Sequence, residues 1–103
     1  MRQIIDGKRY DTETAALIGE TSSEHSRTDF EWWQAGLYVT RKGAFFLAGR
    51  GGPSSMFAHH LKIGRTGGER IIPMDRSEAL AWASEQLPVS IVESVFQDTI
   101  EDA

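Results

Sequence analysis

A chain of 103 residues with 40% hydrophobic and 25% charged residues has the size and composition of one globular domain, which excludes a wholly disordered chain. The absence of cysteine excludes disulfides and thiolate metal sites, and fits a reducing compartment. The opening segment is too short for a signal peptide and no apolar run reaches membrane-spanning length, so we expect a cytoplasmic protein with disorder confined to its last few residues.

The net charge of −4 is unevenly distributed along the chain. Residues 1–40 carry four basic and seven acidic side chains, residues 41–70 carry six and one, and residues 71–103 carry one and seven. A basic middle segment and an acidic tail bear on which partners the protein binds, and they say little about its fold. Two solvated faces that partly neutralise one another are the simpler explanation, and a binding footprint is the alternative.

The N-terminal third predicts a hairpin, a short helix and a loop. Asp6-Gly7 lies between two β-prone runs, and both residues tolerate the positive φ angles of a two-residue turn. Asp11 or Thr12 can cap the helix, and Gly19 can end it. The strands are expected at residues 2–5 and 8–10, and the loop at residues 21–29.

The strongest local signal is the segment FEWWQAGLYVTRKGAFFLAG, residues 30–49. Two aromatic and β-branched runs are joined by a three-residue connection that ends in Gly43, which predicts a hairpin with a bulge. Its large apolar side chains alternate between two faces, so no more than about half of them can enter a one-sided core. We therefore expect exposed aromatic surface unless helices or a partner cover the second face.

The segment FFLAGRGGPSSMFAHHLK, residues 45–62, runs from a strand through a glycine turn into an expected helix at residues 53–61. That helix would begin with a proline, whose missing N–H costs little at the first position. Residues 63–68 are typical of a loop, and residues 69–74 of a short strand. Pro73 places the end of this strand at a sheet edge or at its terminus.

Two helices are expected at the C-terminal end. Asp75 and Glu78 have the spacing of a capping box, and Pro88 ends the helix that they begin. A last helix follows over residues 89–100. The order ββαββαβαα predicts a single α+β domain over residues 1–103, with an antiparallel sheet of about four to five strands and helices packed on one face.

The glycine turn invites comparison with phosphate-binding loops. A mononucleotide loop needs a lysine and a hydroxyl after its last glycine, and a dinucleotide loop needs a third glycine inside a parallel βαβ unit; GRGGPSS has neither. We favour a tight strand-to-helix corner, and keep an anion site at the start of the expected helix as the alternative. The residues of that alternative site are Arg50, Gly51, Gly52, Ser54, Ser55, Lys62 and Arg65.

The histidines and the paired carboxylates provide no complete catalytic set. His59 and His60 are adjacent, so on a helix they diverge by about 100° and cannot ligate one metal together, and His25 would have to join them from a distant loop. Asp29 and Glu31 can share a face of an expected strand, as a catalytic pair or a magnesium site requires, but solvation at the strand edge explains them as well. We expect no enzymatic activity, no cofactor and no metal site. An enzyme that uses His59 or His60 remains an alternative, and requires one of them in a pocket beside a carboxylate.

Trp32 and Trp33 direct two indoles to opposite faces of the expected strand. We expect one indole in the core, and the other is either an anchor for a protein partner or covered by a helix. The basic middle with its aromatics also suits a single-strand nucleic-acid binder, although the acidic net charge is unusual for that class.

Three segments resemble a family of small, mostly uncharacterised proteins of bacterial prophages, plasmids and conjugative elements: IIDGKRYDTETA, LYVTRKGAFFLAGRGGPSS and IIPMDRSEALAWASEQL. The resemblance covers nearly the whole chain, and no functional residue can be transferred from it. Proteins of this size and origin include anti-CRISPR inhibitors, which bind Cas effector complexes and block DNA binding or cleavage. The resemblance therefore implies an inhibitor of host defence as an expectation from context.

Together these observations predict a non-enzymatic protein-binding module that occludes a surface of a larger protein or nucleoprotein, such as a Cas effector complex. The alternative is nucleic-acid or phosphate-ligand binding through the basic middle segment. An unpaired edge of the central hairpin leaves both a monomer and a homodimer open. The residues expected to contact a protein partner are Trp32, Tyr38, Arg41, Lys42 and Arg50 on one face, with Glu93, Asp98, Glu101 and Asp102 for electrostatic contact.

Overall fold

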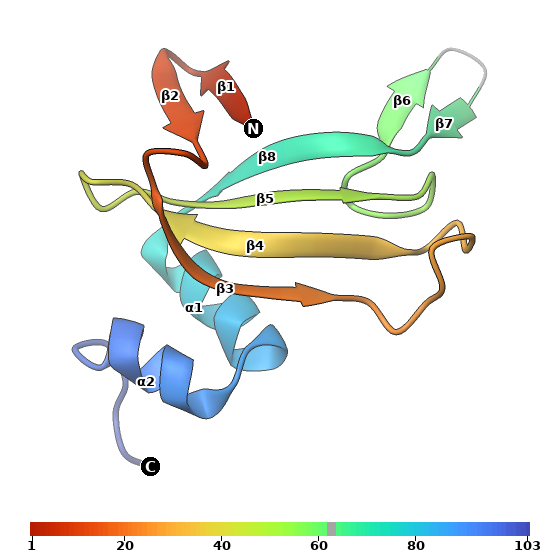
Figure 1. Cartoon of the computed structure of the whole chain (residues 1–103). Coiled ribbons are helices and arrows are strands. Elements are labelled where there is room, and N and C mark those ends of the chain that lie inside the picture. Colours follow the sequence, from red (N-terminus) through yellow and green to blue (C-terminus); the bar gives the residue numbers. More distant parts are fainter. Residues whose placement is uncertain (62–63) are drawn as a thin grey trace.

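A four-stranded antiparallel sheet forms the centre of the protein, and the order of its strands is β3-β4-β5-β8 (Figure 1). The structure is a computed structural model that describes residues 1–61 and 64–103, with the backbone alone for residues 60 and 61. The strands of this sheet are β3 (Ala16–Ser22), β4 (Trp33–Val39), β5 (Phe45–Gly51) and β8 (Gly68–Met74). Two small hairpins and two helices complete the fold: β1 (Arg2–Ile5) with β2 (Lys8–Asp11), β6 (His59–Leu61) with β7 (Gly64–Thr66), and then α1 (Arg76–Gln86) and α2 (Val89–Phe96). This architecture confirms the predicted α+β class, with an antiparallel sheet and helices packed on it.

The β4–β5 hairpin is confirmed with the expected turn. Its pairs run from Val39 opposite Phe45 to Trp33 opposite Gly51. Gly43 has a φ angle of +87°, which a residue with a Cβ rarely adopts, and this explains the glycine at the end of the connection. Both edges of the hairpin are paired, with β3 on one side and β8 on the other. The predicted free hairpin edge is therefore wrong, and the outer strands of the sheet are β3 and β8.

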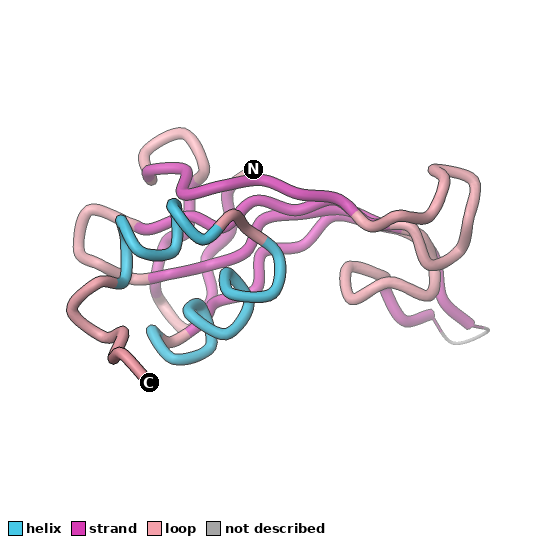
Figure 2. The backbone as a smooth tube through the Cα atoms, turned by 90° about the horizontal axis from the view of Figure 1, so that it is seen from below, coloured by secondary structure: helices cyan, strands magenta, loops and turns pink. Residues whose placement is uncertain are grey.

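The two helices cover one face of the sheet at one end, where the larger hydrophobic core lies (Figure 2). The predicted capping box is present at Asp75 and Glu78, so α1 begins where the sequence indicates. Gly19 leaves room for Leu87, whose methyl groups lie 3.0 Å from where a Cβ would be. The buried residues of this core are Leu37, Phe45, Leu47, Ala79, Ala83, Leu87, Val92 and Phe96.

The opposite face of the sheet is covered at the same end by the β1–β2 hairpin. Tyr10 packs edge-on against Phe46, with ring centroids 5.5 Å apart, and Ala48 and Ile71 complete this smaller core. The backbone N–H of Ile71 donates to the side chain of Gln3, so the hairpin also occupies part of the outer edge of β8. The second face of the aromatic hairpin is thus covered by strands rather than by a helix.

The predicted helix between Asp11 and Gly19 is wrong. Asp11 does accept a hydrogen bond from the backbone N–H of Glu13, at 2.9 Å, but the turn that it caps is not continued as a helix. The chain instead forms β3, which pairs with β4 along its length and carries a bulge between Leu17 and Gly19. The hydrogen-bonding edge of β4 outweighs the weak local preference for a helix.

The predicted helix at residues 53–61 is also absent. Turns replace its first part, and its last three residues form β6. The expected loop at residues 63–68 contains β7 and the first residue of β8, while position 63 lies outside the described residues.

The expected last helix ends at Phe96 rather than near Ile100, and a turn follows it. Neither helix in the described part of the chain combines the length and the apolar character needed to cross a membrane.

Candidate functional site

The end of the sheet away from the helices is built from loops (Figure 2). We define the loop end as residues 23–32 and 52–58 together with the adjoining ends of β4, β5 and β8. We define the helix end as α1, α2 and the part of the sheet that they cover. The two loops lie against each other, because the N–H of Gly52 donates to the carbonyl of Trp32 at 2.7 Å and the N–H of Ser54 donates to the carbonyl of Phe30 at 2.8 Å.

The glycines of the expected corner allow close approach between chain segments. A Cβ at Gly49 would lie 2.5 Å from the ring of Phe57 and 2.6 Å from the carbonyl of Gln34. Positive φ angles occur at three described glycines, and those of the expected corner are not among them. Phe57 is fully buried as a result, so these glycines let the 52–58 loop pack against β5 rather than turn the chain into a helix.

The backbone donors of the expected anion site are used within the chain. The amides of Gly52 and Ser54 bind carbonyls of the first loop, and the amide of Ser55 donates to the carbonyl of Gly52 at 3.0 Å. The Ser55 hydroxyl donates to that same carbonyl at 2.7 Å. The helix start that would have presented these amides is absent, Arg65 lies exposed on β7, and position 62 lies outside the described residues.

Aromatic and cationic side chains gather at the loop end. Phe30 is 69% exposed and Met56 is 44% exposed. The guanidinium carbons of Arg27 and Arg50 lie 5.0 Å and 6.0 Å from the centroid of the Trp32 ring, which is cation–π distance. The structure therefore brings two of the predicted contact residues, Trp32 and Arg50, together and adds Arg27 and Phe30, which the sequence did not single out.

Neither tryptophan of the pair belongs to the buried core, so the prediction that one of them does is wrong. Trp32 is half-buried just before β4 begins. Trp33 is half-buried as the first residue of β4, and it lines a shallow hollow of about 410 Å³. The other residues that line this hollow are Ser23, Glu24, His25, Glu31, Ser54, Ser55 and Met56.

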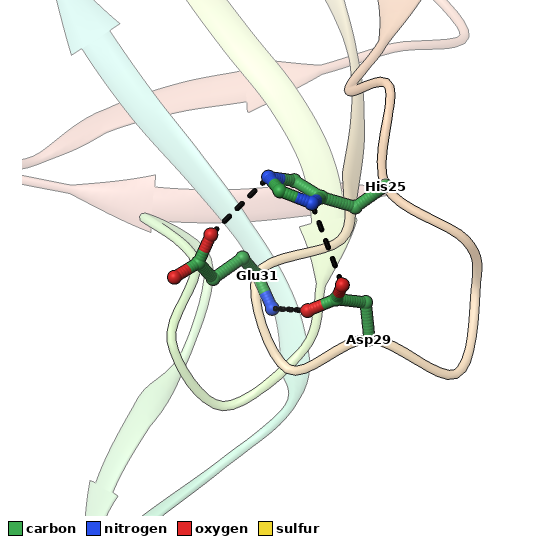
Figure 3. Close-up of side chains that lie close together, drawn as sticks. All are labelled: His25, Asp29 and Glu31. Carbon is green, nitrogen blue, oxygen red and sulfur yellow. Dashed lines mark hydrogen bonds and ion pairs between the residues drawn. The ribbon is translucent and has the colours of Figure 1, made fainter.

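His25 lies between two carboxylates on the first loop (Figure 3). Its Nδ1 is 3.4 Å from Oδ2 of Asp29, and its Nε2 is 3.2 Å from Oε2 of Glu31. The backbone N–H of Glu31 donates to Oδ1 of Asp29 at 3.1 Å, which holds the Asp29 side chain in place. Asp29 and Glu31 are thus on a loop rather than on the expected strand, and His25 joins them and not the other histidines.

A second, larger hollow of about 560 Å³ lies on the face of the sheet opposite the helices, beside the β1–β2 hairpin. Tyr38 lines it and stacks on Phe46, with ring centroids 5.3 Å apart. Burial raises the pKa of Tyr38 above its usual value, and the negative charge of Glu20 raises it further. The charged lining residues Glu20, Glu69 and Arg50 keep this surface polar.

The other predicted contact residues lie elsewhere. Arg41 and Lys42 are exposed on the turn between β4 and β5, at the end of the hairpin opposite Arg50. The acidic residues lie on or after the last helix and are all exposed; they are Glu93, Asp98, Glu101 and Asp102. The predicted contact residues therefore do not form one continuous patch.

The histidine pair lies on β6 and not on a helix. The ring of His59 is exposed and lies against Gly68, and no described carboxylate is within ion-pair distance of it. The side chain of His60 lies outside the described part of the structure. Comparisons of the chain with protein-family models, with curated proteins and with solved structures found no match.

Proposed function

We propose that this protein is a non-enzymatic binding module that covers a surface of a larger protein or nucleoprotein, and that the loop end makes the contact. The observation that carries the proposal is an exposed Phe30 two residues before Trp32, whose ring has two guanidinium groups at cation–π distance. Aromatic residues and arginine are the residue types that most often dominate the binding energy of protein interfaces.

Contacts within the chain hold the exposed side chains of the loop end near one another. The guanidinium groups of Arg27 and Arg50 lie at cation–π distance from Trp32, and this attraction lowers the conformational entropy that they lose on association. The backbone hydrogen bonds between the two loops hold Phe30 and Met56 at the same end of the molecule. A partner would therefore meet exposed apolar side chains and cations at this end.

The mixed charge of the loop end favours a protein partner over bare nucleic acid. Among its described residues, the carboxylates outnumber the basic side chains, which disfavours a continuous cationic track. The basic residues are Arg27, Arg50 and Arg70, and the acidic residues are Glu24, Asp29, Glu31 and Glu69. Nucleic-acid binding also draws on backbone amides, and those of Gly52, Ser54 and Ser55 are already bonded within the chain.

A Cas effector complex is the partner to test first. The reason is the resemblance of three segments of the chain to proteins of prophages, plasmids and conjugative elements, a setting in which anti-CRISPR inhibitors occur. The proposal accordingly includes a cytoplasmic location. Such an inhibitor would act by covering the surface of the complex that binds or cleaves DNA, and this mode of action requires no catalytic group.

The test is titration against purified Cas effector complexes, together with affinity capture and mass spectrometry with and without nuclease. Phe30→Ala should weaken a stoichiometric protein complex by about 30-fold, in the range of an interface hot spot. Val89→Ala is the matched control, because Val89 is 70% exposed at the helix end and should leave the affinity unchanged. Equal losses in both variants, or no stoichiometric protein partner, would contradict the proposal.

The nucleic-acid alternative has its own readout in the same experiment. It predicts binding to oligonucleotides that weakens steeply as salt rises, and that is lost when Arg27 and Arg50 are both replaced by Ala. A partner that appears only without nuclease would favour this alternative. A partner that resists nuclease and depends on Phe30 would favour the protein interface.

A further inference from the structure

We propose that His25 and Glu31 bind a divalent first-row transition-metal ion such as Zn²⁺, and that Asp29 positions the imidazole for this purpose. The sequence indicated Asp29 and Glu31 only as a magnesium pair on a strand. It linked His25 only with the distant His59 and His60, so it did not bring the three residues of this site together. The loop places all three together, with one ligand atom from each within 4.8 Å of the others. The proposal does not depend on the protein-binding role of the loop end.

The separation between His25 and Glu31 suits two ligands of a single ion. Ligands that share a tetrahedral ion with bonds of about 2.1 Å lie roughly 3.4 Å from one another. His25 Nε2 and Glu31 Oε2 are 3.2 Å apart, which is close to this separation and longer than a charge-assisted N–H to carboxylate hydrogen bond of about 2.7–2.9 Å. Asp29 lies at Nδ1, on the other side of the ring, and cannot share the same ion with Nε2. Small side-chain movements on an exposed loop would therefore admit an ion next to the imidazole.

The charge of the loop provides a second argument. Asp29 and Glu31 are exposed carboxylates whose ion-pair contacts, in the described part of the chain, are with His25 alone. Two carboxylates beside one imidazole attract a divalent cation.

The position of the hollow indicates which nitrogen holds the metal. Figure 3 shows the two carboxylates at opposite nitrogens of the ring. His25 and Glu31 line the 410 Å³ hollow, and Asp29 does not. The ion would therefore bind Nε2 and Glu31 on the hollow side, while Nδ1–H donates to Asp29, as metal-binding histidines commonly donate to a carboxylate.

The donor set indicates the class of metal. One imidazole nitrogen with carboxylate oxygen suits Zn²⁺, Mn²⁺, Fe²⁺ or Co²⁺, whereas Mg²⁺ and Ca²⁺ prefer oxygen ligands only. Glu24 and the hydroxyl-bearing Ser23 and Ser54 line the same hollow, so further oxygen ligands and water can complete the coordination. Hydrogen bonds between Ser23 and Trp33 close the base of the loop and hold its ligands near one another.

The test is isothermal titration of tag-free, chelator-treated protein with Zn²⁺, Mn²⁺ and Mg²⁺. Zn²⁺ should bind at one site per chain, more tightly than Mn²⁺, and Mg²⁺ should give no saturable binding. His25→Ala should abolish the site, and Glu31→Gln should weaken it more than tenfold. His59→Ala and Glu85→Gln are controls, as an exposed histidine and an exposed carboxylate outside the loop, and should leave the affinity unchanged.

Asp29→Asn tests the positioning role separately. It should weaken Zn²⁺ binding about tenfold, as loss of a carboxylate behind a metal-binding histidine does, and Asp29→Glu should restore part of the affinity. The unfolding temperature of the metal-free protein should stay the same in these exposed-loop variants, which excludes a purely structural effect. Unchanged Zn²⁺ affinity in Asp29→Asn would overturn this role.

Two results would overturn the metal site as a whole. One is the absence of saturable Zn²⁺ binding by the intact protein, with His25 NMR signals that do not respond to Zn²⁺. The other is Zn²⁺ binding that survives His25→Ala. Since metal binding is measured without a partner, either result leaves the proposed protein-binding function unaffected.

Discussion

The helix end and the loop end lie on the same sheet and share strands β4, β5 and β8, yet they bury their apolar residues differently. At the helix end, α1 and α2 cover the sheet, and Phe96 is fully buried with its ring stacked on Phe45 at 5.4 Å. At the loop end, glycines allow the 52–58 loop to pack onto the strands through Phe57, while Phe30 remains 69% exposed. The first arrangement stabilises the fold, and the second leaves large side chains available to a partner.

The difference depends on what lies against the sheet: side chains of the helices at the helix end, and the backbone of a loop at the loop end. A helix brings a stripe of apolar side chains against a sheet and excludes water over a wide area. At the loop end, the close approach of the 52–58 loop requires glycine beneath it and buries Phe57, whereas Phe30 and Met56 stay exposed. We therefore expect substitutions at the helix end to change stability, and substitutions at the loop end to change binding.

The largest effect is expected for Phe96→Ala at the helix end. Removing a fully buried aromatic ring should lower the free energy of unfolding by about 3–5 kcal/mol, a large part of the total for a domain of this size. Urea denaturation followed by circular dichroism measures this loss. Phe96→Leu should cost clearly less, and an equal cost for both variants would argue against a packed ring at this position.

A smaller loss is expected for Gly49→Ala. The added Cβ would lie 2.5 Å from Phe57 and 2.6 Å from a backbone carbonyl that cannot move away easily, so overpacking should cost about 1–3 kcal/mol. Gly36→Ala is the matched control on β4, because its nearest neighbours are the side chains of Leu17 and Tyr38 at 3.1 Å, which can shift. Chemical denaturation of both variants should rank them in this order. The reverse ranking would contradict the close packing of the 52–58 loop.

The Asp75 cap of α1 should contribute about 1 kcal/mol to the free energy of unfolding. Asp75 accepts from the N–H of Glu78 at 2.8 Å, so Asp75→Ala leaves a donor of the first turn unpaired. Asp75→Asn keeps an acceptor at this position and should retain most of the stability. Thermal unfolding of the two variants measures the difference, which would vanish if α1 did not depend on this cap.

Phe30→Ala should change the free energy of unfolding by less than about 0.5 kcal/mol, since its side chain is mostly exposed. The same variant should lose the protein partner, as set out above. Together with Phe96→Ala, it separates stability from binding across the two ends. A large loss of stability in Phe30→Ala would remove this separation.

The smallest effect concerns Tyr38 and alkaline pH. Its pKa is raised in the folded protein, first by burial and then by Glu20, so the folded state holds the phenolic proton more tightly than the unfolded state. The resulting stabilisation is full below the usual tyrosine pKa of about 10 and is lost as the pH rises through the folded value. Urea titrations between about pH 8 and pH 11 should show a steeper loss for the intact protein than for Tyr38→Phe.

Local chemistry in the sequence predicted much of the helix end. The Asp6-Gly7 turn, the connection ending in Gly43 and the capping box at Asp75 each determine their element through nearby residues, and all three are confirmed. The loop end was predicted less well. Both expected helices that proved wrong are replaced at least in part by paired strands: Ala16–Ser22 pairs with β4, and the end of the second expected helix pairs with β7. Strand pairing depends on a partner segment outside the stretch that was assigned to the helix.

The candidate site shows the same limit. Trp32 and Arg50 were selected for their residue types, but their stacking depends on the pairing of β4 with β5 and on the contact between the two loops. His25, Asp29 and Glu31 lie within seven positions of one another, and this clustering of ligand types in one loop was the available signal. It was missed because Asp29 and Glu31 were assigned to a strand.

By itself, the sequence determined the fold class, the β1–β2 and β4–β5 turns and the start of the first helix, because turns and caps depend on the φ angles and hydrogen bonds of a few adjacent residues. Only the tertiary structure decided that Ala16–Ser22 is a strand, that the glycines of the 49–52 segment serve close packing, and that His25 faces two carboxylates. The first two features arise from backbone pairing and loop contacts between residues distant in sequence, and the third from the path of a loop that spans residues 23–32; weak local preferences do not specify any of them.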